Sequence, residues 1–87
     1  MSRRDRINHA LTQALHPTAL EVIDESHLHA GHSGAQPGGE THYRVIISAR
    51  AFQGTTLVAR HRLINEALRD EFATGLHALA IVASPAS

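Results

Sequence analysis

From Ile7 on, apolar residues recur at helical spacing. Ile7 is followed by apolar residues three, four, seven and eight positions later, which places one apolar stripe along a helix. Ser2 with Asp5 three positions on is an N-cap arrangement, and Pro17 closes the far end of the segment. The pattern predicts an amphipathic helix within these limits.

Two later segments, 19–24 and 42–50, alternate between apolar and polar residues and predict β-strands. No helical pattern lies between them, so antiparallel pairing is the simplest arrangement. The apolar faces are formed by Leu20 and Val22 in the first strand and by Tyr43, Val45 and Ile47 in the second.

A second apolar stripe predicts a helix that is capped by Thr55 or Thr56, ends near Phe72 and is terminated at Gly75. Residues 76–83 are small and apolar on both faces and predict a third strand. A strand that follows a helix in this way is expected to lie parallel to the preceding strand, through a right-handed crossover. The helical stripe consists of Leu57, Leu63, Ile64, Ala67, Leu68 and Phe72.

The order helix, strand, strand, helix, strand predicts an α+β domain of two layers, an α-β-β-α-β arrangement. The helices are expected on one face of a three-stranded mixed sheet. Eighty-seven residues leave room for one core, so we expect a single domain over 1–87. A segment rich in histidine and glycine, at about 25–40, then becomes a loop between the first two strands.

Charge and cysteine content narrow the function. Eight basic residues, all Arg, balance eight acidic ones, and a net charge of zero argues against a protein that depends on phosphate contacts. The chain has no Cys and therefore supplies no thiolate ligand. No stretch approaches the roughly 20 apolar residues of a membrane span, so we expect a cytoplasmic protein. No nucleophile paired with a base is apparent, and we expect no enzymatic activity.

Histidine is the notable residue type, and four of the eight histidines lie between residues 24 and 43. His27, His29 and His32 follow an H-x-H-x-x-H spacing that suits zinc or nickel, although a helical i, i+4 pair would be a stronger zinc signal. His42 alternates with Tyr43 in the second strand, and we expect it to make a structural hydrogen bond. From spacing alone, His77 is most simply a histidine at the end of a strand, hydrogen-bonded to a neighbouring residue.

Five phrases resemble the BolA family in the same order and spacing. They are LEVIDESHLHAGH, GGETHYRV, F-x-G at Phe52 to Gly54, LVARHRLINEAL and GLHALAI, and they cover the chain from about Ile7 to Val82. The resemblance implies a fold like class II KH domains, in agreement with the element order. It also implies pairing with a monothiol glutaredoxin and a shared, bridging [2Fe-2S] cluster, for cluster trafficking or iron and redox regulation. Glutaredoxin would supply a cysteine and glutathione another thiolate, so no cofactor is expected in the isolated chain.

The same resemblance implies two ligands from this chain. One is the histidine of the HAL run, here His77, and the other lies in the loop, where family branches carry either His or Cys. Because this chain has no Cys, it falls in the histidine branch. Counting from DES places the loop ligand at His29, counting back from GETH places it nearer His32, and His27 is the remaining alternative. Imidazole is an acceptable iron ligand, as in Rieske centres.

A KH-like fold also leaves a nucleic-acid-binding transcriptional regulator as an alternative. The segment ARHRLINEALR places Arg60, His61, Arg62 and Arg69 on the second predicted helix, as a surface for a protein partner or for nucleic acid. Zero net charge, few aromatic residues and the absence of a G-x-x-G clamp between helices predict only weak DNA binding. The same arginines suit the carboxylates of glutaredoxin or glutathione.

Overall fold

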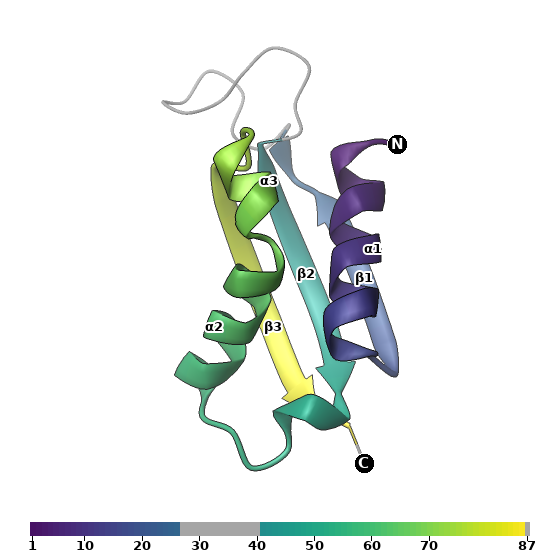
Figure 1. The fold of residues 1–87 in the computed structure, drawn as a ribbon, viewed down its shortest axis with the longest axis vertical. Helices are drawn as coiled ribbons and strands as arrows, with labels where there is room; N and C mark the ends of the chain where they lie inside the picture. Colours follow the sequence, from purple (N-terminus) through teal and green to yellow (C-terminus); the bar gives the residue numbers. More distant parts are fainter. Residues whose placement is uncertain (27–40, 87) are drawn as a thin grey trace.

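The computed structural model describes residues 1–26 and 41–86, so the predicted loop ligands His27, His29 and His32 lie outside the described residues. Within those two ranges a helix is followed by two strands, then by a 3₁₀ turn and two helices, and last by a third strand (Figure 1). They are α1 (Arg3–Leu15), β1 (Ala19–Asp24), β2 (His42–Ala49), the short 3₁₀ turn η2 (Arg50–Phe52), α2 (Leu57–Ala67), α3 (Arg69–Ala73) and β3 (Ala78–Pro85).

The three strands form one mixed sheet in the order β1-β2-β3. β1 pairs antiparallel with β2, and β3 pairs parallel with β2, as predicted. Val22 stands opposite Val45, which stands opposite Ile81, and this row faces the helices. α1 covers β1 and α2 covers β3 on the same face of the sheet (Figure 1). The predicted two-layer α+β architecture is therefore confirmed.

The first helix begins where the sequence predicted. The Ser2 hydroxyl accepts from the Asp5 amide at 3.1 Å and the Asp5 carboxylate accepts from the Ser2 amide at 3.2 Å, a complete capping box. Ile7, Leu11 and Leu15 are buried in the core. These i, i+4 positions on one stripe are what attach α1 to the sheet.

The second predicted helix is two helices in the structure. α2 ends at Ala67 and α3 starts at Arg69, with Leu68 between them at φ −104° and ψ 12°. The Leu68 amide is shared between the carbonyls of Ile64 and Asn65, at 3.0 and 3.2 Å. This tightening toward 3₁₀ spacing turns α3 away from the line of α2.

The predicted stripe on this helix is wrong at three positions. Ile64 and Leu68 are fully buried, whereas exposed side chains are found at Leu57 (63%), Leu63 (40%) and Phe72 (37%). Leu57 is the first residue of α2, next to its N-cap Thr56. Phe72 follows the change of direction at Leu68, which rotates it out of the line of Ile64.

The third strand is displaced by two residues from its predicted span of 76–83. Leu76 is buried, but its amide bonds to the Glu71 carbonyl at 2.9 Å and so belongs to the turn after α3. Gly75 has φ +132°, a conformation that favours glycine, close to the predicted terminator position. Strand pairing with β2 starts only at Ala78.

The face of the sheet opposite the helices is partly apolar. It carries Ile46 and Val82, which are paired across β2 and β3 and are 38% and 50% exposed. Among the helices described, none has the length and apolar character needed to cross a lipid bilayer.

Candidate functional site

His42 and His77 meet at the end of the sheet where the described chain stops at Ser26 and resumes at Thr41. His42 begins β2 and His77 immediately precedes β3. Their ring centroids are 5.2 Å apart and the ring planes are tilted by 55°. His77 is exposed, whereas His42 is only 6% exposed. Of the two imidazoles, His77 is the one placed to meet a partner.

Thr41 fixes the backbone of His77. Its carbonyl accepts from the His77 amide at 2.8 Å and from the Ala78 amide at 3.1 Å. These bonds precede the parallel ladder between β2 and β3, which continues from the His42–Ala78 pair. The predicted ligand His77 therefore stands on ordered backbone beside the start of β2.

His42 makes the structural hydrogen bond that the sequence predicted. Its Nδ1 lies 2.8 Å from Oγ1 of Thr41, and both residues are buried. The proximity of His42 to His77 was not predicted. The parallel register of β2 and β3 is the signal that could have found it, because His42 stands opposite the residue that follows His77.

Ser26 ends the first described range and is hydrogen-bonded to Thr41 and His42, which begin the second. Its hydroxyl accepts from the Thr41 amide at 3.0 Å and from the His42 amide at 3.1 Å, and donates to the His42 carbonyl at 3.4 Å. The Ser26 amide donates to Oδ1 of Asp24 at 2.8 Å. Sequence reasoning missed this residue, since a single serine carries no pattern.

A buried ion pair supports the turn before His77. Nη1 of Arg3 lies 2.8 Å from Oε1 of Glu71, and Nη2 of Arg3 donates to the Thr74 carbonyl at 3.0 Å. Nε of Arg6 lies 3.1 Å from Oε2 of Glu71. A Cβ added to Gly75 would stand 3.0 Å from the Arg3 guanidinium, so the turn packs closely against α1.

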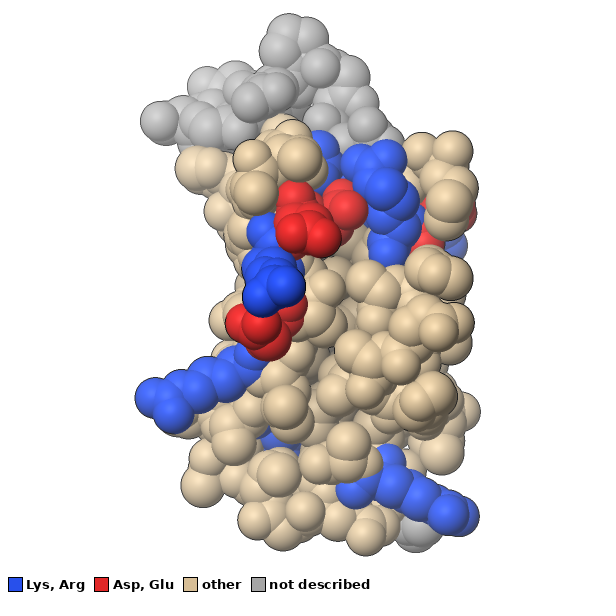
Figure 2. All heavy atoms as spheres, viewed as in Figure 1, with Lys and Arg blue, Asp and Glu red and all other residues tan. Residues whose placement is uncertain are grey.

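Charged side chains of both signs alternate over this end of the molecule (Figure 2). They come from the first turns of α1 and from the α2–α3 segment. Because both signs are present, this face offers a mixed surface rather than a basic one.

The predicted partner surface on the second helix is divided. Arg60 is half-buried and donates to Oγ1 of Thr55 and to the carbonyls of Thr55 and Ala83, each at 3.1 Å. Arg69 is exposed and lies 2.9 Å from Oε1 of Glu66. His61 and Arg62 are exposed on α2, which begins at the end of the sheet remote from the start of β3 (Figure 1). Arg60 and Arg69 make their described contacts with residues other than His77.

Two hollows accompany these elements. One lies beside His42 and is lined by Glu25, Arg44 and the first residues of β3, with Nε of Arg44 2.9 Å from Oε2 of Glu25.

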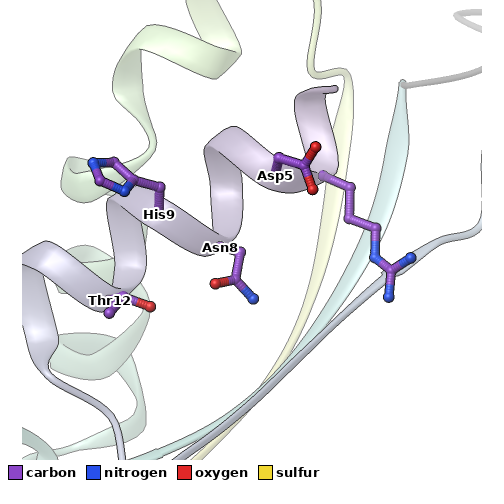
Figure 3. A pocket seen from close by; sticks show the side chains of 5 residues that line it. Asp5, Asn8, His9 and Thr12 are labelled. Carbon is purple, nitrogen blue, oxygen red and sulfur yellow. The ribbon is translucent and has the colours of Figure 1, made fainter. Parts of the chain in front are cut away.

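The other hollow follows one side of α1, where Asp5, Asn8, His9 and Thr12 line it (Figure 3). Hydrogen bonds from the backbone and then the side chain of Ser2 hold the pKa of Asp5 below its usual value. Helix capping accounts for this shift.

In residues 1–26 and 41–86, no three His, Asp or Glu side chains are grouped so that they could hold a metal ion. His77 offers one exposed imidazole. A site completed between this chain and a partner is compatible with that donor set.

Comparison with known proteins identifies relatives. A family model described as BolA-like protein matches residues 11–87. SufE-like protein 1, chloroplastic/mitochondrial, of Arabidopsis thaliana is 51% identical over 86 residues, which is 94% of this chain but 23% of that longer protein. The DNA-binding transcriptional regulator BolA of Escherichia coli is 38% identical over 81 residues, covering 93% of this chain and 73% of the relative. The solved BolA domain of SufE1 from Arabidopsis thaliana has a TM-score of 0.87 at 50% identity, over 98% of this chain and 93% of that one.

Proposed function

Because this chain belongs to the BolA family, we propose that it is a binding protein that pairs with a monothiol glutaredoxin and shares a bridging [2Fe-2S] cluster with it. In this proposal His77 supplies one ligand and His29 or His32 supplies a second, with glutathione and the glutaredoxin cysteine completing the set. The cluster is cargo that the pair holds and hands on, or senses.

One observation carries the proposal. The exposed His77 is bonded through its amide to the carbonyl of Thr41, the first described residue after the histidine-rich segment. The two parts of the chain to which the family resemblance assigns ligands are therefore joined at one hydrogen-bonded junction. An imidazole on ordered backbone at this junction loses little freedom on ligation, which favours binding.

Imidazole ligation suits a carrier. A neutral imidazole in place of an anionic thiolate raises the potential of an iron–sulfur cluster. Protonated histidine cannot bind metal, so ligation weakens in acid. Acid would therefore favour release of the cluster from this chain.

The experiment is co-expression of this chain with a monothiol glutaredoxin, followed by visible absorption of the purified pair. We expect a coloured heterodimer from the unmodified chain and loss of most of the colour in His77→Ala. His9→Ala is the matched control, since His9 is an exposed histidine on α1. Equal colour in His77→Ala and His9→Ala would remove His77 from the site.

The loop histidines have their own variants. His29→Ala and His32→Ala are each expected to shift the spectrum, and the double variant to destabilise the shared cluster much further, because neighbouring imidazoles can substitute for one another. A double variant with the spectrum of the unmodified pair would exclude both as ligands.

Transcriptional regulation is the second candidate, since the Escherichia coli relative is named a DNA-binding transcriptional regulator. The charges argue for weak binding here, because Arg60 bonds within the domain and Arg69 is paired with Glu66. Each phosphate contact adds a slope of about −0.9 to a log–log plot of affinity against salt. We expect low affinity that falls steeply with salt, and tight sequence-selective binding at physiological salt would favour the regulator instead.

A further inference from the structure

We infer that Ser26 is a positioning residue for His77: its hydroxyl sets the Thr41 peptide, which in turn holds the His77 backbone and the neighbouring His42 ring. The inference rests on the proposed function in treating His77 as a metal ligand. The geometry of the junction itself is independent of any metal.

The Ser26 hydroxyl uses its full hydrogen-bonding capacity. A hydroxyl has one proton to donate and two lone pairs to accept with, and here it meets one carbonyl and two amides of residues 41 and 42. Ser26 is 6% exposed, so these groups are paired away from solvent. The carboxylate of Asp24 holds the Ser26 amide, which fixes the hydroxyl from its own side.

Two routes lead from this hydroxyl to His77. The first is the backbone: the Thr41 amide bonds to Ser26, and the Thr41 carbonyl accepts from His77. The second is the side chains: Oγ1 of Thr41 meets Nδ1 of His42, whose ring lies against the ring of His77. A shift of the Thr41 backbone therefore moves both the carbonyl that binds the His77 amide and the His42 ring that lies beside the His77 ring.

The hydrogen bonds at position 26 explain why the residue there is a serine. Alanine would leave the amides of Thr41 and His42 facing a methyl group, in a place that water reaches poorly. Threonine keeps the hydroxyl and tests whether the hydrogen bonds, rather than the volume, are what matters. Ser48 is a matched control, because its hydroxyl bonds to that of Ser84 at 2.8 Å near the other end of β2 and is exposed.

The first experiment uses the free protein and needs no cluster. Amide hydrogen exchange and the His77 ring resonances are measured by NMR in Ser26→Ala, Ser26→Thr and Ser48→Ala. We expect exchange at Thr41, His42 and His77 to rise about tenfold in Ser26→Ala, the effect of one lost buried hydrogen bond. Ser26→Thr and Ser48→Ala should retain the unmodified rates at these amides.

Unchanged exchange and unchanged His77 resonances in Ser26→Ala would overturn the inference. If Ser26→Ala does not fold, exchange in the unmodified protein tests the inference. Thr41 and His42 amides that exchange as fast as exposed amides would show that their hydrogen bonds to the Ser26 hydroxyl do not form. Protected amides there would support it.

The second experiment uses the glutaredoxin pair. We expect Ser26→Ala to shorten the half-time of cluster release several-fold and to alter the electron paramagnetic resonance of the reduced cluster, with Ser26→Thr restoring both. A Ser26→Ala pair that behaves as the unmodified pair does would overturn the inference. If the unmodified pair holds no cluster, the proposed function fails, and the exchange experiment alone judges whether Ser26 positions His77.

Discussion

The ring of His77 lies 5.2 Å from the ring of His42, yet the two histidines have opposite environments. His42 is buried and bonded to Thr41, whereas His77 is exposed at the mouth of the same junction. The His42 imidazole is part of the packed interior, and the His77 imidazole is held at the surface. This division of roles makes the two positions separable by mutation.

His42→Ala should destabilise the free domain by about 2 kcal/mol, because it removes a buried side chain and leaves the Thr41 hydroxyl without its ring partner. His77→Ala should change the free energy of unfolding by less than about 0.5 kcal/mol, as exposed substitutions usually do. Urea unfolding of both variants is the measurement. Equal losses of stability would show that His77 is also part of the packed structure.

Breaking the ion pair between Arg3 and Glu71 should lower the free energy of unfolding far more than breaking the surface pair between Arg69 and Glu66. Removing one partner of a buried pair leaves an uncompensated charge and costs about 3–5 kcal/mol. Exposed pairs contribute about 0–1 kcal/mol. We therefore expect Glu71→Gln to lower stability by several kcal/mol and Glu66→Gln to have little effect, as measured by denaturant unfolding. Similar effects from the two variants would contradict the buried character of the first pair.

Gly75→Ala should be more costly than Gly54→Ala, although both glycines have positive φ. Gly54 has φ +71° and open space where a Cβ would be, so alanine there meets only backbone strain, about 1–2 kcal/mol. At Gly75 the Cβ also meets the Arg3 guanidinium at 3.0 Å.

A double-mutant cycle checks the cause of that difference. The extra cost of Gly75→Ala should shrink in an Arg3→Ala background, where the obstructing guanidinium is gone. If the cost stays the same without Arg3, the backbone conformation alone explains it.

Asp5 should contribute a small, pH-dependent part of the stability. Its folded pKa is held below the ordinary value of 3.8 by the hydrogen bonds from Ser2. A depressed carboxyl pKa stabilises the fold above that ordinary value, and the contribution is lost as pH falls through the folded pKa. Asp5→Asn should therefore be less stable than the unmodified chain at neutral pH, and the gap should close in acid. A gap that is constant with pH would mean that the carboxylate charge is not the cause.

Much of the fold follows from local pattern. The alternation in β1 and β2 places Val22 and Val45 in the core, and the capping box starts α1, because both depend on residues close in sequence. The break at Leu68 was missed because the apolar stripe continues through it without a Gly or Pro to mark the change.

The candidate site was only half predictable. His77 stood out through its resemblance to a family motif, but its neighbours were set by pairings between distant segments. Ser26 and Thr41 are hydrogen-bonded although they lie 15 positions apart, and the contact of His42 with His77 depends on strand register. No periodicity in a single segment carries information about such contacts.

The contact between Arg3 and Glu71 spans 68 positions, which has a consequence for the order of events during synthesis. The first turn of α1 leaves the ribosome early, at rates of roughly 5–20 residues per second. Its partner on α3 emerges seconds later, followed within a few residues by His77. The turn that presents this histidine can therefore be secured only when nearly all of the described chain has been made. A nascent chain that ends at Ala67 already carries β1, β2 and α2 but not His77, so translation itself delays the moment at which the junction is complete.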